Sequence, residues 1–86
     1  MKVVNLKKEK YDLYIGRGTV WGNPFVIGKD GTREEVINKF EKIARTNSAL
    51  IQFIKDLPEN IILGYYCKPK ACHGDIIIKI WKELHK

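Results

Sequence analysis

One apolar run near the C-terminus limits the folds open to this chain. Residues 61–67, Ile-Ile-Leu-Gly-Tyr-Tyr-Cys, form an apolar stretch between the turn residues 58–60 and the polar segment 68–70. A strand covered on both faces has a continuous apolar sequence, whereas a half-exposed strand alternates between apolar and polar residues. The run therefore predicts a central strand of the kind found in α/β sheets.

A helical pattern precedes this run. Thr32 and Glu35 have the spacing of a capping box, in which each side chain bonds the other residue's backbone N–H. The apolar residues that follow recur at the spacing of one helical face: Val36, Ile37, Phe40, Ile43 and Ala44. After an interruption at Asn47-Ser48, residues 50–54 continue as a shorter helix. Two helices are therefore predicted before the central strand.

A further helix is predicted after the run, at the C-terminus. Asp75 stands near its start, and its apolar face comprises Ile77, Ile80, Trp81 and Leu84. The β-branched run 76–78 favours a strand instead. The acid at the start and the lysines towards the end match the dipole of a helix, so we expect a helix.

The order of these elements predicts the fold class. Residues 3–6 and 11–15 fit short strands, either paired as a hairpin or lying apart in one sheet. A chain of 86 residues allows one domain with a modest core. We therefore expect a single α/β domain over residues 1–86, a small Rossmann-like sheet of about three strands in two or three layers with helices.

Two loops follow predicted strands and carry most of the chain's unusual chemistry. They are residues 16–25 and 67–75. In an α/β sheet, ligands bind outside the carboxyl ends of the strands, so we expect both loops to share one pocket. The candidate ligand-binding residues are Gly16, Arg17, Trp21, Asn23, Tyr66, Cys67, Lys68, Cys72, His73, Gly74 and Asp75.

The residue types in these loops suit a phosphate. Gly16 lets the backbone approach a ligand, and the Arg17 guanidinium suits a phosphate or carboxylate. Backbone N–H groups at 73–75 would face the ligand from a helix N-terminus, and Gly74 would leave room for it. Trp21 or Tyr66 would stack on a base. We therefore expect a nucleotide or another phosphorylated small molecule as ligand.

Three other interpretations of these residues are open. Cys72 beside His73 at a helix start would suit a nucleophile. Cys67, Cys72, His73 and His85 would make a zinc set, but their spacing is unusual for structural zinc, so we expect no metal and no cofactor. Nucleic acid is a third ligand, stacked on the aromatic residues Tyr11, Tyr14, Trp21, Tyr65 and Tyr66.

Composition narrows the class of partner. Sixteen lysines and arginines against ten acidic residues give a net charge of +6, which favours phosphate-bearing partners or simply aids solubility. No leader-like segment or membrane-length apolar run is present, so we expect a cytoplasmic protein without a membrane partner. The two cysteines are close enough in sequence for a tight disulfide, but a reducing cytosol favours free thiols, metal ligation or redox chemistry.

Five separated motifs resemble, in order, the signature of a small domain of unknown function, number 4326, found in phages and cellular genomes. They are Tyr14-Ile15-Gly16-Arg17, Gly22-Asn23-Pro24-Phe25, Arg33-Glu34-Glu35, Tyr66-Cys67-Lys68-Pro69 and Cys72-His73-Gly74-Asp75. The strand and Gly-Asp helix start are also similar to the nucleotide-binding loop of Rossmann-like proteins related to lysine decarboxylase-like phosphoribohydrolases.

That second similarity implies nucleotide binding. Those proteins have longer sheets, which implies a reduced sheet or a homodimer here. Hydrolysis and sequestration of the ligand are both open. The alternative function is a basic module that binds nucleic acid or a host protein.

Overall fold

Three parallel strands form one sheet in the computed structural model, which describes residues 1–86. The elements follow the order β1 (Lys2–Asn5), β2 (Leu13–Tyr14), α1 (Arg33–Thr46), α2 (Ser48–Lys55), β3 (Ile62–Tyr65) and α3 (His73–Leu84). The spatial order is β1, β3, β2, and both outer strands pair with β3. The predicted α/β class and the central position of the third strand are confirmed, and the two N-terminal strands do not form a hairpin.

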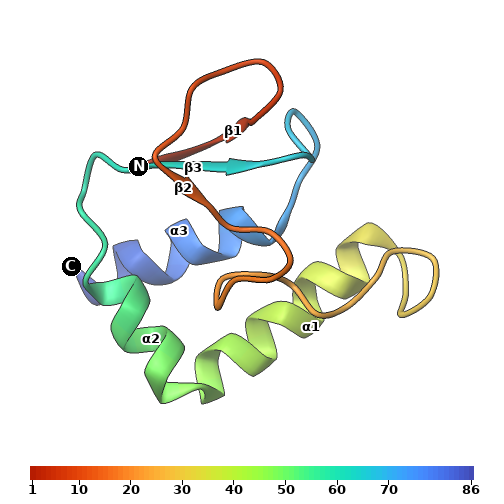
Figure 1. Ribbon diagram of the computed structural model, residues 1–86. Coiled ribbons are helices and arrows are strands. Elements are labelled where there is room, and N and C mark those ends of the chain that lie inside the picture. Colours follow the sequence, from red (N-terminus) through yellow and green to blue (C-terminus); the bar gives the residue numbers. More distant parts are fainter.

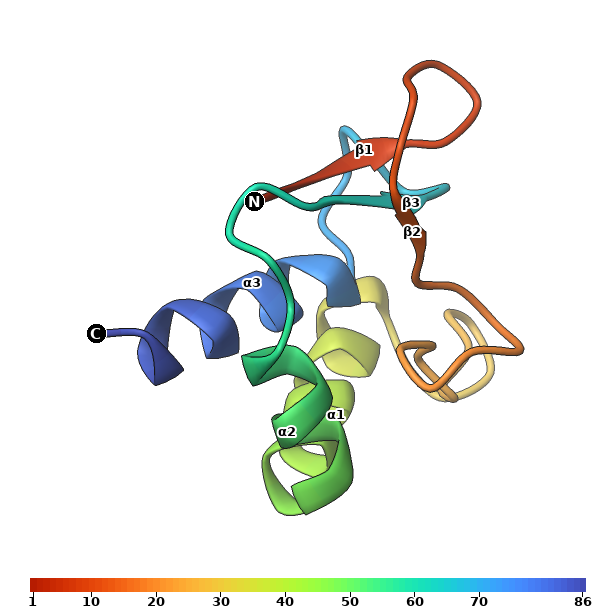
Figure 2. The same ribbon diagram turned by 60° about the vertical axis from the view of Figure 1, so that its left-hand side comes forward.

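The helices all lie on one side of this sheet (Figures 1 and 2). Helix α3 contacts β1 directly, and α1 and α2 pack against α3 and against each other. The loop between β1 and β2 rises on the opposite side of the sheet. None of the three helices has the length and apolar character needed to cross a bilayer. The sheet therefore has one face buried under helices and one face covered only by a loop.

Local capping explains where the helices begin. In α1, the Glu35 backbone N–H donates to Thr32 Oγ1 over 3.2 Å, and the Thr32 N–H donates to Glu35 Oε1 over 3.0 Å. In α3, the Cys72 N–H donates to Asp75 Oδ2 over 3.1 Å. Both pairs satisfy backbone donors that have no partner inside the helix. The predicted capping box and the predicted C-terminal helix are both confirmed.

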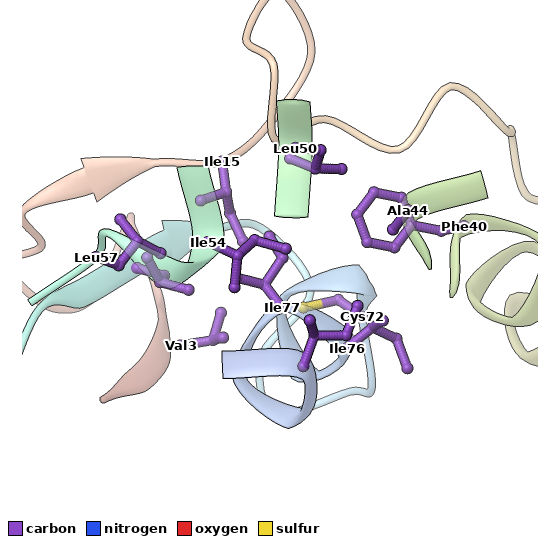
Figure 3. Packing of buried hydrophobic residues seen from close by; sticks show 12 residues of the cluster. Val3, Ile15, Phe40, Ala44, Leu50, Ile54, Leu57, Cys72, Ile76 and Ile77 are labelled. Carbon is purple, nitrogen blue, oxygen red and sulfur yellow. The ribbon is translucent and has the colours of Figure 1, made fainter. Parts of the chain in front are cut away.

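The core lies between the sheet and the helices (Figure 3). Its fully buried large side chains come from every layer: Phe40, Ile15, Ile54, Leu63, Ile77 and Ile80. Burying one such side chain contributes about 1.5–3 kcal/mol. Only 18 of 86 residues are buried, as expected for so short a chain, so each core contact is a sizeable share of the stability.

Gly74 brings the start of α3 into direct contact with the sheet. A Cβ atom at this position would lie 2.7 Å from Val3 Cγ2 and 2.8 Å from Ile15 Cδ1. Because real Cβ atoms almost never come so close, the missing side chain allows the helix to approach the strands. The space in front of Gly74 is filled by the core, not by a ligand.

Candidate functional site

A cavity of about 160 Å³ opens between the loop after β2, the first turns of α1 and the connection from β3 to α3. Its polar or titratable lining consists of Arg17, Asn23, Arg33, Tyr65, Cys67, Cys72 and His73. Its apolar wall consists of Phe25, Val26, Ile27, Val36, Ile37 and Ala71. The two loops that the sequence assigned to one pocket therefore do meet, and α1 adds a third side.

Two arginines give this cavity its charge. Arg17 takes part in none of the ion pairs of the structure. Arg33 donates one hydrogen bond from Nη1 to the Ala71 carbonyl over 3.1 Å, which leaves its other N–H groups for a ligand. No aspartate or glutamate lines the cavity. The lining is therefore suited to an anion.

Tyr65 lines the cavity from β3, and the sequence interpretation missed it in favour of Tyr66. Its ring lies edge-on to the His73 ring, with the centroids 4.7 Å apart. Burial raises the pKa of Tyr65, as do Cys67 and Tyr14, while the Arg17 guanidinium acts in the opposite direction. Period-two alternation from the buried Leu63 could have shown that residue 65 faces the helices.

Tyr66 lies just past the end of β3, is 52% exposed and does not line the cavity. Its ring contacts the Tyr65 ring, with the centroids 5.7 Å apart, so Tyr65 is the tyrosine that meets a ligand in the cavity. Arg33 was also missed, because its capping-box context indicated a helix start and gave no sign that the side chain turns towards the β3–α3 connection.

His73 connects the start of α3 to the end of β2. Its Nε2 lies 2.7 Å from the Ile15 carbonyl oxygen, and because a carbonyl only accepts, Nε2 carries the proton. Burial lowers the pKa of His73, with smaller opposing effects from the Ile15 carbonyl, Asp75 and the Trp21 backbone. His73 is 2% exposed, so it is a neutral, buried part of the cavity floor.

Neither cysteine is bonded to another sulfur. Cys72 is 3% exposed, and burial raises the pKa of its thiol. A protonated, buried thiol is a poor nucleophile, which weakens the interpretation of Cys72 as a catalytic residue. No group of three or more histidine, cysteine, aspartate or glutamate side chains is arranged to hold a metal ion. His85 lies at the far end of α3, 2.9 Å from the Lys55 carbonyl oxygen.

Asn23 lines the cavity, but its side-chain amide is hydrogen-bonded to backbone groups of the loop and of α1. Its Oδ1 accepts from the Phe25 N–H over 2.9 Å, and its Nδ2 donates to the Val36 carbonyl over 3.1 Å. These bonds attach the loop to α1 and hold Phe25 in the cavity wall. Trp21 turns away from the cavity and packs on Phe53, with the ring centroids 6.1 Å apart.

The other candidates serve local structure outside the cavity. Lys68 Nζ pairs with Asp75 Oδ1 over 2.6 Å, so these two residues neutralise each other. A Cβ atom at Gly22 would lie 2.7 Å from the Gly16 carbonyl oxygen, so the first loop folds closely on itself. The cavity lining includes neither Gly16, Lys68, Asp75 nor Gly74.

A second hollow, open and about 240 Å³ in volume, adjoins the cavity. It is lined by Arg17, Gly18, Thr19, Gly22, Asn23 and Pro24, so it shares two residues with the cavity. Thr19 Oγ1 donates to the Gly16 carbonyl over 2.7 Å, which stabilises the turn beneath it. A ligand held at Arg17 could therefore extend from the cavity over this polar surface.

Comparison with known proteins assigns the chain to a family. It matches the family described as a domain of unknown function (DUF4326) over residues 2–83. An uncharacterized 12.4 kDa protein in the nrdA-td intergenic region of Enterobacteria phage T4 is 46% identical over 89 residues, which cover 99% of this chain and 81% of the relative. An uncharacterized protein of Acanthamoeba polyphaga mimivirus is 31% identical over 111 residues, covering 98% of this chain and 82% of the relative. No solved structure matches at a significant level. The chain therefore belongs to the DUF4326 family.

Proposed function

We propose that this protein binds a nucleotide or another phosphorylated small molecule in the cavity between residues 16–25 and 67–75. The observation that carries the proposal is the pair of arginines, Arg17 and Arg33, which line a cavity that contains no acidic residue. Arginine forms paired, charge-assisted hydrogen bonds with phosphate oxygens. The cavity also lies where parallel strands end, the usual ligand position in α/β sheets.

The size of the cavity limits what it can enclose. Its volume of about 160 Å³ is below the roughly 300–1,000 Å³ of pockets that enclose a drug-sized ligand. A phosphate with part of a sugar fits this space better than a whole nucleotide. The remainder of a nucleotide would lie over the adjoining hollow beside Thr19 and Pro24, which is open to solvent.

The same residues favour binding over chemistry. The Cys72 thiol has a raised pKa, and the His73 Nε2 proton is already donated to the Ile15 carbonyl. The thiol is therefore not prepared to act as a nucleophile, while the neutral His73 ring keeps Nδ1 as its one acceptor. Sequestration of a phosphorylated ligand needs only the arginines and the cavity wall, and we favour it over hydrolysis.

Thermal unfolding with a panel of mono-, di- and cyclic nucleotides and inorganic phosphate tests the proposal. A ligand at tenfold excess over its Kd stabilises the fold by about 1.4 kcal/mol, which corresponds to roughly 6–11 °C in a domain of this size. Arg17→Gln should weaken binding about tenfold or more, because it removes a charged hydrogen-bond donor.

Arg45→Gln is the matched control. Arg45 is a partly exposed arginine on α1 that pairs with Glu41 and Glu83 and does not line the cavity. The control should keep the same ligand-induced shift as the unmodified protein. If no phosphorylated compound raises the unfolding temperature, or if both variants lose the shift equally, the proposal is wrong.

A further inference from the structure

The sheet face away from the helices is the second chemically distinctive surface of the molecule. Strand register places Val4, Gly64 and Tyr14 together, and the ring of Tyr66, just past the end of β3, lies 6.4 Å from that of Tyr14. The loop between β1 and β2 lies on this side (Figures 1 and 2). This face therefore combines strand side chains with the residues of that loop.

Two tyrosines present flat, partly exposed rings on this face. The Tyr11 ring lies directly over Gly64, because a Cβ atom there would be only 2.5 Å from Tyr11 Cγ. Tyr11 is 43% exposed and Tyr66 is 52% exposed. Tyr66 comes two residues after Gly64, just past the end of β3.

Neighbouring aromatic rings support Tyr66 at its edge. Its ring centroid lies 6.4 Å from that of Tyr14 and 5.7 Å from that of Tyr65, both edge-on. These two neighbours restrict the Tyr66 ring, and 52% of the residue's surface stays exposed. Tyr66 is therefore a pre-positioned stacking surface.

Lysines surround these rings. Lys7 Nζ lies 5.7 Å from the centroid of the Tyr66 ring. An open hollow of about 530 Å³ is lined by residues 6–11, which include three lysines, Lys7, Lys8 and Lys10, and one acidic residue, Glu9. None of these three lysines takes part in an ion pair. Their charge is therefore available to an anionic partner.

Asn5 holds the lysines and the tyrosine in place relative to each other. Its Oδ1 accepts from the Lys7 N–H over 2.9 Å, while its Nδ2 donates to the Tyr66 and Lys68 carbonyls over 3.2 and 3.0 Å. One side chain thus joins the loop after β1 to the end of β3. These bonds hold the Lys7 backbone beside that of Tyr66, while the Lys7 ammonium remains on a flexible side chain.

We propose that this face binds single-stranded nucleic acid, with bases stacked on Tyr11 and Tyr66 and phosphates contacted by Lys7, Lys8 and Lys10. Exposed aromatic rings beside a basic groove are the features that hold unpaired bases and their backbone. In a duplex the bases are already stacked, so the rings would add nothing to its binding. Residues 6–11 lie on the side of the sheet away from the helices, whereas Tyr66 contacts the cavity residue Tyr65, so the two sites adjoin at this pair of rings.

Fluorescence anisotropy with a labelled oligothymidylate of about 12 nucleotides tests this site. Tyr66→Ala and Tyr11→Ala should each weaken binding about 5- to 150-fold, the range expected for one stacked base. Tyr66→Leu keeps an apolar side chain without the ring and should lose a similar factor. Phe53→Ala is the control, since Phe53 is 46% exposed and belongs to α2, on the helical side of the molecule.

Salt dependence tests the lysines separately. In a series between about 50 and 200 mM salt, each lysine that contacts a phosphate contributes roughly 0.7 to the slope of log K against log salt. The double variant Lys7→Gln, Lys10→Gln should therefore flatten the slope by about 1.4. The double variant Lys42→Gln, Lys82→Gln changes the net charge equally through helix residues and should leave the slope unchanged.

Three results would overturn the inference, in variants whose folding is confirmed by circular dichroism. The first is no binding of the oligonucleotide by the unmodified protein. The second is duplex binding of equal strength that does not respond to Tyr66→Leu. The third is competition by polyglutamate as effective as that by unlabelled oligonucleotide, which would indicate a surface for acidic proteins instead.

Discussion

Replacing Gly74 with alanine separates a packing role from a ligand-binding role at the start of α3. The added Cβ would lie 2.7 Å from Val3 Cγ2 and 2.8 Å from Ile15 Cδ1, whereas ordinary contacts begin at 3.4 Å. The new atom is therefore about 0.7 Å too close to Val3 (3.4 minus 2.7). Val3 is a β-branched residue on a strand and has little freedom to rotate away.

The expected loss of stability follows from two opposing effects. Overpacking a core position costs about 1–3 kcal/mol. Alanine is a better helix former than glycine by at most about 1 kcal/mol, and by less in the first turn. The net destabilisation of Gly74→Ala is therefore about 1–2 kcal/mol, or roughly 4–16 °C in unfolding temperature.

Urea denaturation of four proteins measures this effect: the unmodified chain, Gly74→Ala, Val3→Ala and the double variant. Because Val3→Ala removes two of the three atoms that crowd the new Cβ and leaves only Ile15 Cδ1, the double variant should be more stable than the sum of the single losses by about 1 kcal/mol. Folded Gly74→Ala should bind ligand normally. The packing account is refuted if Gly74→Ala is as stable as the unmodified chain, or if the two losses simply add.

Two further predictions concern titratable groups. The pKa of His73 in the folded protein lies below its usual 6.5, so the unfolded chain takes up this proton first as the pH falls. The free energy of unfolding should therefore be full above about pH 6.5 and should decrease below it by up to about 1.36 kcal/mol per pH unit. Urea denaturation across pH measures this slope, which His73→Gln should lose. Three carboxylates also have a lowered pKa, namely Glu35, Glu41 and Glu83. Their protonation changes the free energy of unfolding only below about pH 4.5, so it does not overlap with the effect of His73 near pH 6.5. The buried Cys72 thiol, with its raised pKa, should react with iodoacetamide more slowly than the half-buried Cys67, as followed by mass spectrometry; equal rates would contradict the burial of Cys72.

Local signals made most of the fold predictable. The capping box at Thr32 and Glu35 marks the start of α1, because those two hydrogen bonds involve only residues of the same turn. The apolar run before Cys67 identified the central strand, because burial on both faces removes the polar residues. Parallel pairing of β1 and β2 with β3 depends on contacts far apart in the sequence, which no local pattern contains.

The candidate site was predictable only in part for the same reason. Cavity residues Arg17, Asn23, Cys67, Cys72 and His73 were found because they occupy loops that follow strands. The pairing of Lys68 with Asp75 depends on the path of the chain between them, which composition does not reveal. The choice between Tyr65 and Tyr66 depends on where β3 ends, because Tyr65 is its last residue and lines the cavity, whereas Tyr66 lies just beyond it.

The most direct test of ligand binding between the two loops is a two-dimensional amide NMR titration of the unmodified protein with AMP. The account predicts that the shifted signals belong to residues 16–25, 33–37 and 65–73, and that Arg17→Gln abolishes these shifts at the same AMP concentration. Signals of residues 6–11, on the other face of the sheet, should not move. Shifts confined to residues 6–11, or none at saturating AMP and at saturating inorganic phosphate, would contradict a phosphate-binding cavity at Arg17 and Arg33.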